Sequence, residues 1–202
     1  MNRFVLTLII ALTAVFACQA LTPRQAVDRA AAKLKGSATT RVAYTMTADG
    51  RKTRGLLTIA GNRFTVSSPG MASWYDGKTQ WTYSDQMGEV NVVTPTADEL
   101  QQINPLAIIS SLASDFTLSS VKAPKGYTTV SMKAKSTSKD LRDATVTFSD
   151  ATSLPTQIRG ILAGGHRIEI EINSITPGGV LPDSYFRFDP KKYPGVQVVD
   201  LR

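Results

Sequence analysis

Most of the chain after residue 38 alternates between hydrophobic and polar residues with a period of two, most clearly at residues 168–172. This period places successive side chains on opposite faces of a β-strand. Turn residues such as Asp49-Gly50 and Asp76-Gly77 separate the alternating segments, as they do in antiparallel hairpins. About eleven strands are expected, and so many amphipathic strands in succession favour one sheet that curls with its hydrophobic face inward.

Two segments depart from this period and predict helices. Residues 22–25 combine an N-cap threonine, a proline at the first helical position and the glutamine of a capping box, and Gly36 ends this helix. Residues 96–99 form a second capping box, and a further helix restarts at Asn104-Pro105. Helices as short as the two that begin near residues 96 and 104 are marginally stable alone, so these two are expected to dock on an apolar surface.

The expected fold is therefore mainly β: an unclosed antiparallel β-barrel of about eleven strands with a lid of short helices. A barrel of about eight strands is just filled by its own side chains, so a larger one leaves room for a ligand. A flattened and fully packed sandwich is the alternative. The residues predicted to line the apolar cavity and its lid, and so to bind the ligand, are Val42, Tyr44, Met46, Leu57, Ile59, Phe64, Val66, Trp81, Tyr83, Val90, Val92, Leu106, Ile109, Leu112, Ile168 and Ile170.

The N-terminus predicts export. Residues 1–20 have the pattern of a cleaved signal peptide, with Arg3 before an apolar stretch too short to span a membrane comfortably, and residues 21–202 are expected to form a single domain. Cleavage removes Arg3 and no acidic residue, which lowers the formal net charge from +7 to +6. Cys18 is the only cysteine. Its acylation would make a lipid-anchored protein, whereas cleavage after Ala20 leaves no thiol for a disulfide, for catalysis or for a metal.

The charged residues do not indicate catalysis. Lysines and arginines are scattered, which favours simple solubility over an anionic partner, and an exported chain is not expected to bind nucleic acid. His166, the only histidine, follows a Gly-Gly turn and is expected to be an exposed hairpin residue, while Glu169 and Glu171 belong to a solvated strand face. There is no phosphate-binding loop and no cluster with metal-ligand spacing. We therefore expect no enzyme activity, no cofactor and no metal.

Three segments carry a resemblance to a known family. Residues 74–83 (WYDGKTQWTY), 95–106 (PTADELQQINPL) and 181–190 (LPDSYFRFDP) are similar to the periplasmic outer-membrane lipoprotein carrier family (LolA-like), in a Bacteroidetes-type version. The resemblance covers essentially the whole mature chain, and the hairpin at residues 76–81 is its sharpest local motif. It implies an unclosed antiparallel barrel with a helical lid, in agreement with the alternation.

The resemblance also implies a function. The cavity would take the acyl chains of a lipoprotein, or a related lipid, from an inner-membrane lipoprotein-releasing transporter, and a monomer would carry them through the periplasm to an outer-membrane acceptor. A lipid-sensing regulatory or binding module, or a lipid-anchored receptor, on the same fold is the alternative. Proteobacterial carriers have an Arg-Pro pair before the Phe-containing strand, where the arginine ties lid to barrel. Here the turn is Ala60-Gly61-Asn62, with Arg63 nearby, so no such role is transferred.

Overall fold

The computed structural model describes residues 21–96, 99, 114–137 and 141–202. In this part of the chain, twelve strands form one sheet in the order β12-β6-β5-β4-β3-β2-β1-β11-β10-β9-β8-β7. Their bounds are β1 (Thr39–Ala48), β2 (Arg51–Ala60), β3 (Arg63–Ser68), β4 (Met71–Tyr75), β5 (Gln80–Ser84), β6 (Glu89–Val93), β7 (Phe116–Val121), β8 (Tyr127–Ala134), β9 (Leu141–Ser149), β10 (Pro155–Leu162), β11 (Arg167–Gly178) and β12 (Gln197–Asp200).

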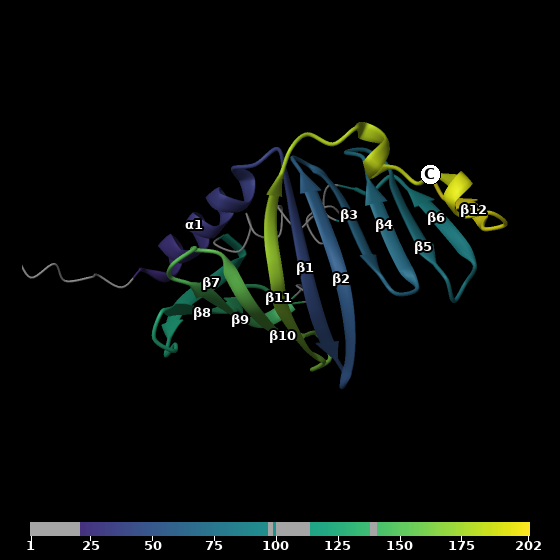
Figure 1. The fold of residues 1–202 in the computed structure, drawn as a ribbon. Coiled ribbons are helices and arrows are strands. Elements are labelled where there is room, and N and C mark those ends of the chain that lie inside the picture. Colours follow the sequence, from purple (N-terminus) through teal and green to yellow (C-terminus); the bar gives the residue numbers. More distant parts are fainter. Residues whose placement is uncertain (1–20, 97–98, 100–113, 138–140) are drawn as a thin grey trace, which may run out of the picture.

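The sheet is curled but open. β7 and β12 are its two edges and lie far apart at opposite sides of the molecule (Figure 1). All neighbouring strands run antiparallel except β12 and β6, which are parallel. The prediction of a mainly β, unclosed antiparallel barrel is confirmed, with one strand more than the eleven expected.

The first helix, α1 (Pro23–Lys35), begins and ends as the sequence predicts. The Gln25 backbone N–H donates to Thr22 Oγ1 at 3.2 Å, and the Thr22 N–H donates to Gln25 Oε1 at 3.0 Å, which completes the capping box. The second predicted capping box also forms, because Glu99 N–H donates to Thr96 Oγ1 and Thr96 N–H donates to the Glu99 carboxylate. Within the described residues, no helix has the length and hydrophobicity needed to cross a bilayer.

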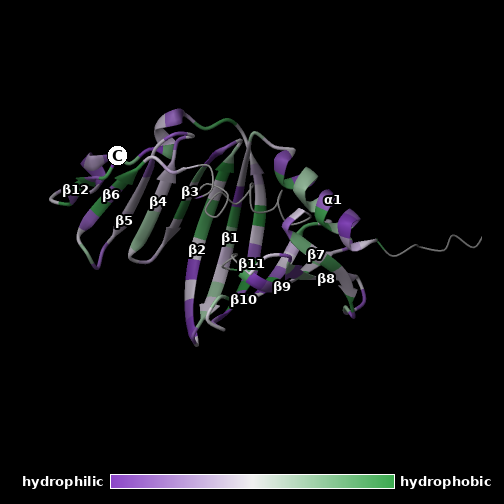
Figure 2. Ribbon diagram, turned by 180° about the vertical axis from the view of Figure 1, so that it is seen from behind, coloured by the Kyte–Doolittle hydropathy of each residue, from purple (hydrophilic) through white to green (hydrophobic). Residues whose placement is uncertain are grey.

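Two antiparallel meanders make up the sheet, and the pairing of β1 with β11 joins them. Residues 39–48 pair with residues 168–178, so the strand that follows α1 lies beside a strand from near the other end of the sequence. The register shifts at Ala43/Tyr44, where β11 has one extra residue, Asn173. Because such a bulge reverses the alternation, Ile172 and Ile175 both lie on the same face of the sheet as Tyr44. In Figure 2 the long strands show the resulting bands of hydrophobic and hydrophilic residues.

The two faces of the sheet are covered by different elements. The inner face is the one on which α1 packs, where Ala26, Val27 and Ala30 meet a core formed by Phe116, Val130, Met132, Ala144, Val146 and Phe148. The outer face is covered over β3–β6 by the C-terminal segment, residues 179–196, which contains the short 3-10 helices η1 (Asp183–Phe186) and η2 (Pro190–Lys192). This segment runs along the top of the sheet in Figure 1. Its Phe186 is fully buried.

The core under α1 makes a first testable prediction. Met132 is fully buried there, so Met132→Ala is expected to lower the free energy of unfolding by about 2–5 kcal/mol, as lost burial and a new cavity do in other cores. Urea denaturation followed by circular dichroism measures this change. Met87 is 70% exposed, so the same substitution there is the matched control and is expected to change stability by less than about 0.5 kcal/mol. Equal effects at the two positions would contradict this placement of the core.

Candidate functional site

Two rows of paired residues cross the inner face from β1 to β8. The first row consists of Met46, Ile170, Ile158, Val146 and Val130, each on a neighbouring strand. The second row consists of Ala48, Ile168, Gly160, Ala144 and Met132 on the same strands. No member of either row is charged. The rows therefore form a continuous apolar surface that spans both meanders.

Burial decreases along these rows with distance from α1. Val130 and Met132, under the helix, are fully buried, and Ala144 and Val146 on β9 are also buried. Ile158 on β10, Ile170 on β11 and Met46 on β1 are only half-buried. The apolar surface thus continues beyond the helix that covers its first part.

Nine of the predicted site residues lie on this inner face: Val42, Tyr44, Met46, Leu57, Ile59, Phe64, Val66, Ile168 and Ile170. Ile59 and Phe64 pair across β2 and β3 and are buried. The Phe64 ring lies 5.4 Å from that of Tyr75, an inner-face residue that the sequence analysis missed. Ile158, Ile172 and Ile175 belong to the same face and were also missed. Ile172 continues the alternation of Ile168 and Ile170, whereas Ile175 lies on this face because of the bulge at Asn173.

Tyr44 lies beside the β1 end of the first row, two positions before Met46. Its ring lies over Gly55 on β2, where an added Cβ would come within 2.3 Å of Tyr44 Cζ. Glycine at position 55 therefore makes room for the ring to lie flat against the sheet. Burial raises the pKa of the Tyr44 hydroxyl above its ordinary value, so this group stays neutral and is a hydrogen-bond donor at physiological pH.

Four predicted site residues, Trp81, Tyr83, Val90 and Val92, lie on the outer face instead. The hairpin registers explain the difference, because Phe64 pairs with Tyr75 and Tyr75 with Gln80, which puts Gln80 on the inner face and its neighbour Trp81 on the outer one. Tyr83 pairs with Val90, and Trp81 with Val92. The expectation that these four residues share a face with Phe64 is therefore corrected. Following the strand registers through the turns at residues 69–70 and 76–79 places them on the opposite face from Phe64.

The C-terminal segment covers these outer aromatic residues. The Trp74 ring lies 5.6 Å from those of Phe188 and Tyr193, and Tyr193 lies 4.8 Å from Tyr83. Arg187 Nε donates to the Asp76 carboxylate at 2.9 Å, which ties the segment to the β4–β5 hairpin. The two segments that resemble the carrier family, residues 74–83 and 181–190, therefore pack against each other.

Arg63 belongs to the same contact. Its guanidinium lies 4.7 Å from the centroid of the Phe186 ring and pairs with the Asp183 carboxylate. It therefore holds the C-terminal segment on the outer face, a role different from that of the proteobacterial lid arginine. The predicted lid residues Leu106, Ile109 and Leu112 lie outside the described residues.

A hollow of about 750 Å³ lies on the other side of the sheet from the apolar rows. The outer-face residues Thr47, Thr145, Arg159 and Glu169 line it, together with the hairpin turns at residues 49–50 and 164–166. Its lining also includes Ala144, Gly160, Ile161 and Ile168, so polar and apolar groups are mixed there. His166 is exposed there, and the described residues contain no group of three or more side chains that could hold a metal ion.

Comparison with known proteins identifies the family. The model of the family described as outer membrane lipoprotein carrier protein LolA matches residues 13–161. The chain belongs to the LolA family. Most of the inner-face rows and the whole aromatic hairpin fall within the matched range. None of the curated proteins matches the chain in sequence.

Solved structures with low sequence identity are similar to this chain, and one of them has a TM-score above 0.5. An uncharacterized conserved protein from Thermus thermophilus is similar with a TM-score of 0.57 and 13% identity, over 88% of this chain and 98% of that one. A LolA superfamily protein from Nitrosomonas europaea is similar with a TM-score of 0.45 and 12% identity, over 85% of this chain and all of that one. A putative outer membrane lipoprotein-sorting protein domain from Vibrio parahaemolyticus gives 0.45 and 8%, over 80% and 94%.

The Asp76 contact predicts a pH dependence of stability. Burial of the carboxylate opposes its ionisation, but the backbone N–H groups of Thr79 and Lys78 and the guanidinium of Arg187 hold the pKa of Asp76 below its ordinary value. Because the pKa is lower in the folded chain, the ionised carboxylate stabilises the fold above the unfolded-state pKa, and this contribution disappears as the pH falls through the folded-state pKa.

Asp76→Asn is therefore expected to lower the free energy of unfolding by about 1–2 kcal/mol at neutral pH, and the deficit should shrink below about pH 4. Urea titrations at pH 7 and pH 3 measure both values. Asp28→Asn, at an exposed carboxylate of α1, is the control and should cost less at neutral pH. A deficit for Asp76→Asn that is the same at both pH values would refute the role of the charge.

Proposed function

We propose that this chain is a carrier that holds the acyl chains of lipoproteins, or of related lipids, against the inner face of its sheet. The observation that carries the proposal is the continuation of the apolar rows beyond α1, where Met46, Ile158 and Ile170 are half-buried. A half-covered apolar surface of this kind is typical of a binding site for an apolar partner. Membership of the LolA family supports the same reading.

The energetics suit reversible binding. Each buried methylene contributes about 0.8 kcal/mol, so about ten methylenes along the rows give roughly 8 kcal/mol before the cost of association is subtracted. The surface has no charged group among its paired positions. Binding and release need no chemical step, so the chain acts without catalysis, and transfer follows when a partner offers a better site.

The route follows from the family and from the N-terminal signal. Residues 1–20 direct export and are removed, and the mature monomer receives acylated cargo from an inner-membrane transporter and delivers it to an outer-membrane acceptor. In this proposal Leu106, Ile109 and Leu112 cover the cargo. The nine predicted site residues that lie on the inner face of the sheet contact it. The outer aromatic residues hold the C-terminal segment and do not contact cargo.

Met46→Asp tests the site. A carboxylate in the first row must be desolvated by a bound acyl chain, so affinity for a fluorescent polyene fatty acid and for a triacylated lipopeptide is expected to fall at least about tenfold. Fluorescence titration measures the first ligand, and native mass spectrometry measures the second.

Thr47→Asp is the matched control, because Thr47 is the next residue of β1 and lies on the outer face. The aspartate adds the same negative charge there and is equally unfavourable in a strand, but it should leave the affinity for both ligands within about twofold of the wild type. Lack of uptake by the folded wild-type protein, or equal losses in the two variants, would rule out the inner face as the lipid site.

A further inference from the structure

Four hairpin turns lie at one end of the sheet: residues 49–50, 69–70, 85–88 and 163–166. They share this end because the strands that precede them, β1, β3, β5 and β10, all run in the same direction. We call this the tip end. Figure 1 shows it at the bottom of the view, where the β1–β2 and β10–β11 hairpins project furthest. These two hairpins lie side by side, since Ala48 pairs with Ile168.

Four cationic side chains gather on these two hairpins. Arg51, Lys52 and Arg54 occupy the first positions of β2, and Arg167 begins β11. All four are exposed, and none makes an ion pair or a hydrogen bond through its side chain within the described part of the chain. Their charges are therefore available to an external partner.

Acidic side chains near the tip end offset part of this charge. Glu169 contacts Arg159 at 3.0 Å, and Asp143 pairs with Lys133 in register across β8 and β9, so these two carboxylates face cations. Asp85 and Glu89 have uncharged partners, the Tyr83 hydroxyl and the Asn91 amide, and Asp49 contacts His166 at 3.6 Å. Residues 45–54 and 157–171 of the two projecting hairpins contain five lysines and arginines against three carboxylates, so an excess of positive charge remains there.

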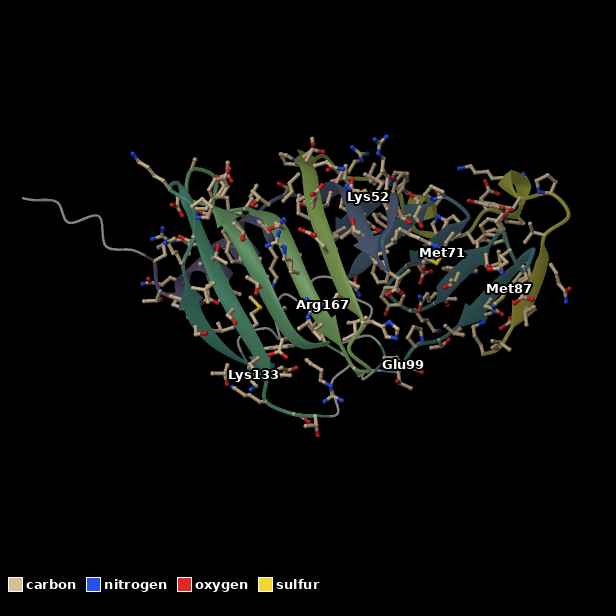
Figure 3. The ribbon with its side chains drawn as sticks, turned by 90° about the horizontal axis from the view of Figure 1, so that it is seen from below. Lys52, Met71, Met87, Glu99, Lys133 and Arg167 are labelled. Atoms are coloured by element: carbon tan, nitrogen blue, oxygen red, sulfur yellow. The ribbon has the colours of Figure 1, made fainter. Side chains whose placement is uncertain are left out.

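Two exposed methionines share this end of the sheet. Met71 is 50% exposed and Met87 is 70% exposed. Their turns are held together by the hydrogen bond from Asp85 N–H to the Gly70 carbonyl at 2.8 Å. Figure 3 looks onto the tip end and shows Met71 and Met87 on the same side of the molecule, with Lys52 and Arg167 toward its centre. Exposed, unbranched apolar side chains at the same end of the sheet as free cations match the chemistry of a membrane interface.

From this arrangement we infer that the tip end is a docking surface for an anionic lipid bilayer. Arg51, Lys52, Arg54 and Arg167 contact lipid phosphates, and the two methionines, on turns set back from the β1–β2 tip, meet the headgroup surface. The turns themselves are uncovered, since an added Cβ at Gly50 or Gly165 would meet no other atom within 4 Å. Docking at this end also places the second apolar row, which runs across the strands close to the tip end, next to the bilayer, but it does not require cargo.

The test is sedimentation with phosphatidylglycerol vesicles, with phosphatidylcholine vesicles as the neutral comparison, at low and at high salt. The wild type is expected to bind the anionic vesicles at low salt and to release them at high salt. The triple variant Arg51→Gln, Lys52→Gln, Arg54→Gln is expected to bind about a hundredfold more weakly, since each basic residue near an anionic surface contributes about a fivefold gain.

The matched control removes the same charge from the opposite end of the sheet. Lys33→Gln, Lys122→Gln and Lys125→Gln change exposed lysines near the end of α1 and in the β7–β8 turn, and should weaken vesicle binding less than about threefold. Met71→Ser with Met87→Ser should weaken binding severalfold while leaving its salt dependence unchanged. Circular dichroism and urea denaturation confirm that each variant is folded.

Two results would overturn the inference: wild-type protein that does not bind phosphatidylglycerol vesicles at low salt, or a control triple variant that loses as much binding as the tip variant. The second result would show that net charge alone is responsible. The inference is separable from the proposed cargo site. Met46→Asp should still bind anionic vesicles, weakened by no more than the roughly fivefold effect of one added negative charge, even though it loses acyl chains. The tip variant should retain its affinity for the fatty acid.

Discussion

The pairing of β1 with β11 is the constraint on which the rest of the structure depends. It joins residues 39–48 to residues 168–178 and so brings two meanders, each built from local hairpins, into one sheet. Closing so long a loop has an entropic cost that only many simultaneous contacts offset, and this ladder of about ten residue pairs supplies them. The bulge at Asn173 matters as much as the pairing itself, because without it the isoleucines on its two sides would lie on opposite faces.

The register of each hairpin then decides what each face does. On the inner face it aligns Met46, Ile170 and Ile158 into a surface that crosses both meanders. On the outer face of β4–β6 it gathers Trp74, Trp81 and Tyr83, which the C-terminal segment covers through Phe188 and Tyr193. One continuous sheet therefore has two apolar regions with different roles: the outer one is closed by the chain itself, and the inner one is closed by α1 over only part of its area.

How far the sequence could predict this structure depends on whether the signal was local. The period of two and the capping residues Thr22 and Gln25 act within a few positions, so the strands and α1 were predicted close to their observed bounds. The face occupied by Trp81 depends on the registers of two successive hairpins, and alternation alone does not reveal it. The cover over Trp74 comes from residues more than a hundred positions away. The tip-end cations likewise come from two hairpins that only the β1–β11 ladder brings together.

The placement of the apolar rows links cargo binding to the stability of the sheet. An acyl chain along Met46, Ile170 and Ile158 contacts β1 from one meander and β10 and β11 from the other, so it adds apolar contacts across the seam between them. A ligand that binds only the folded state stabilises it in proportion to its concentration and affinity. The β1–β11 pairing is where the sheet depends most on long-range contacts, so in the proposed carrier a bound acyl chain would strengthen the pairing that creates its own site. Arg63 and the C-terminal segment brace the outer face, away from the proposed cargo surface.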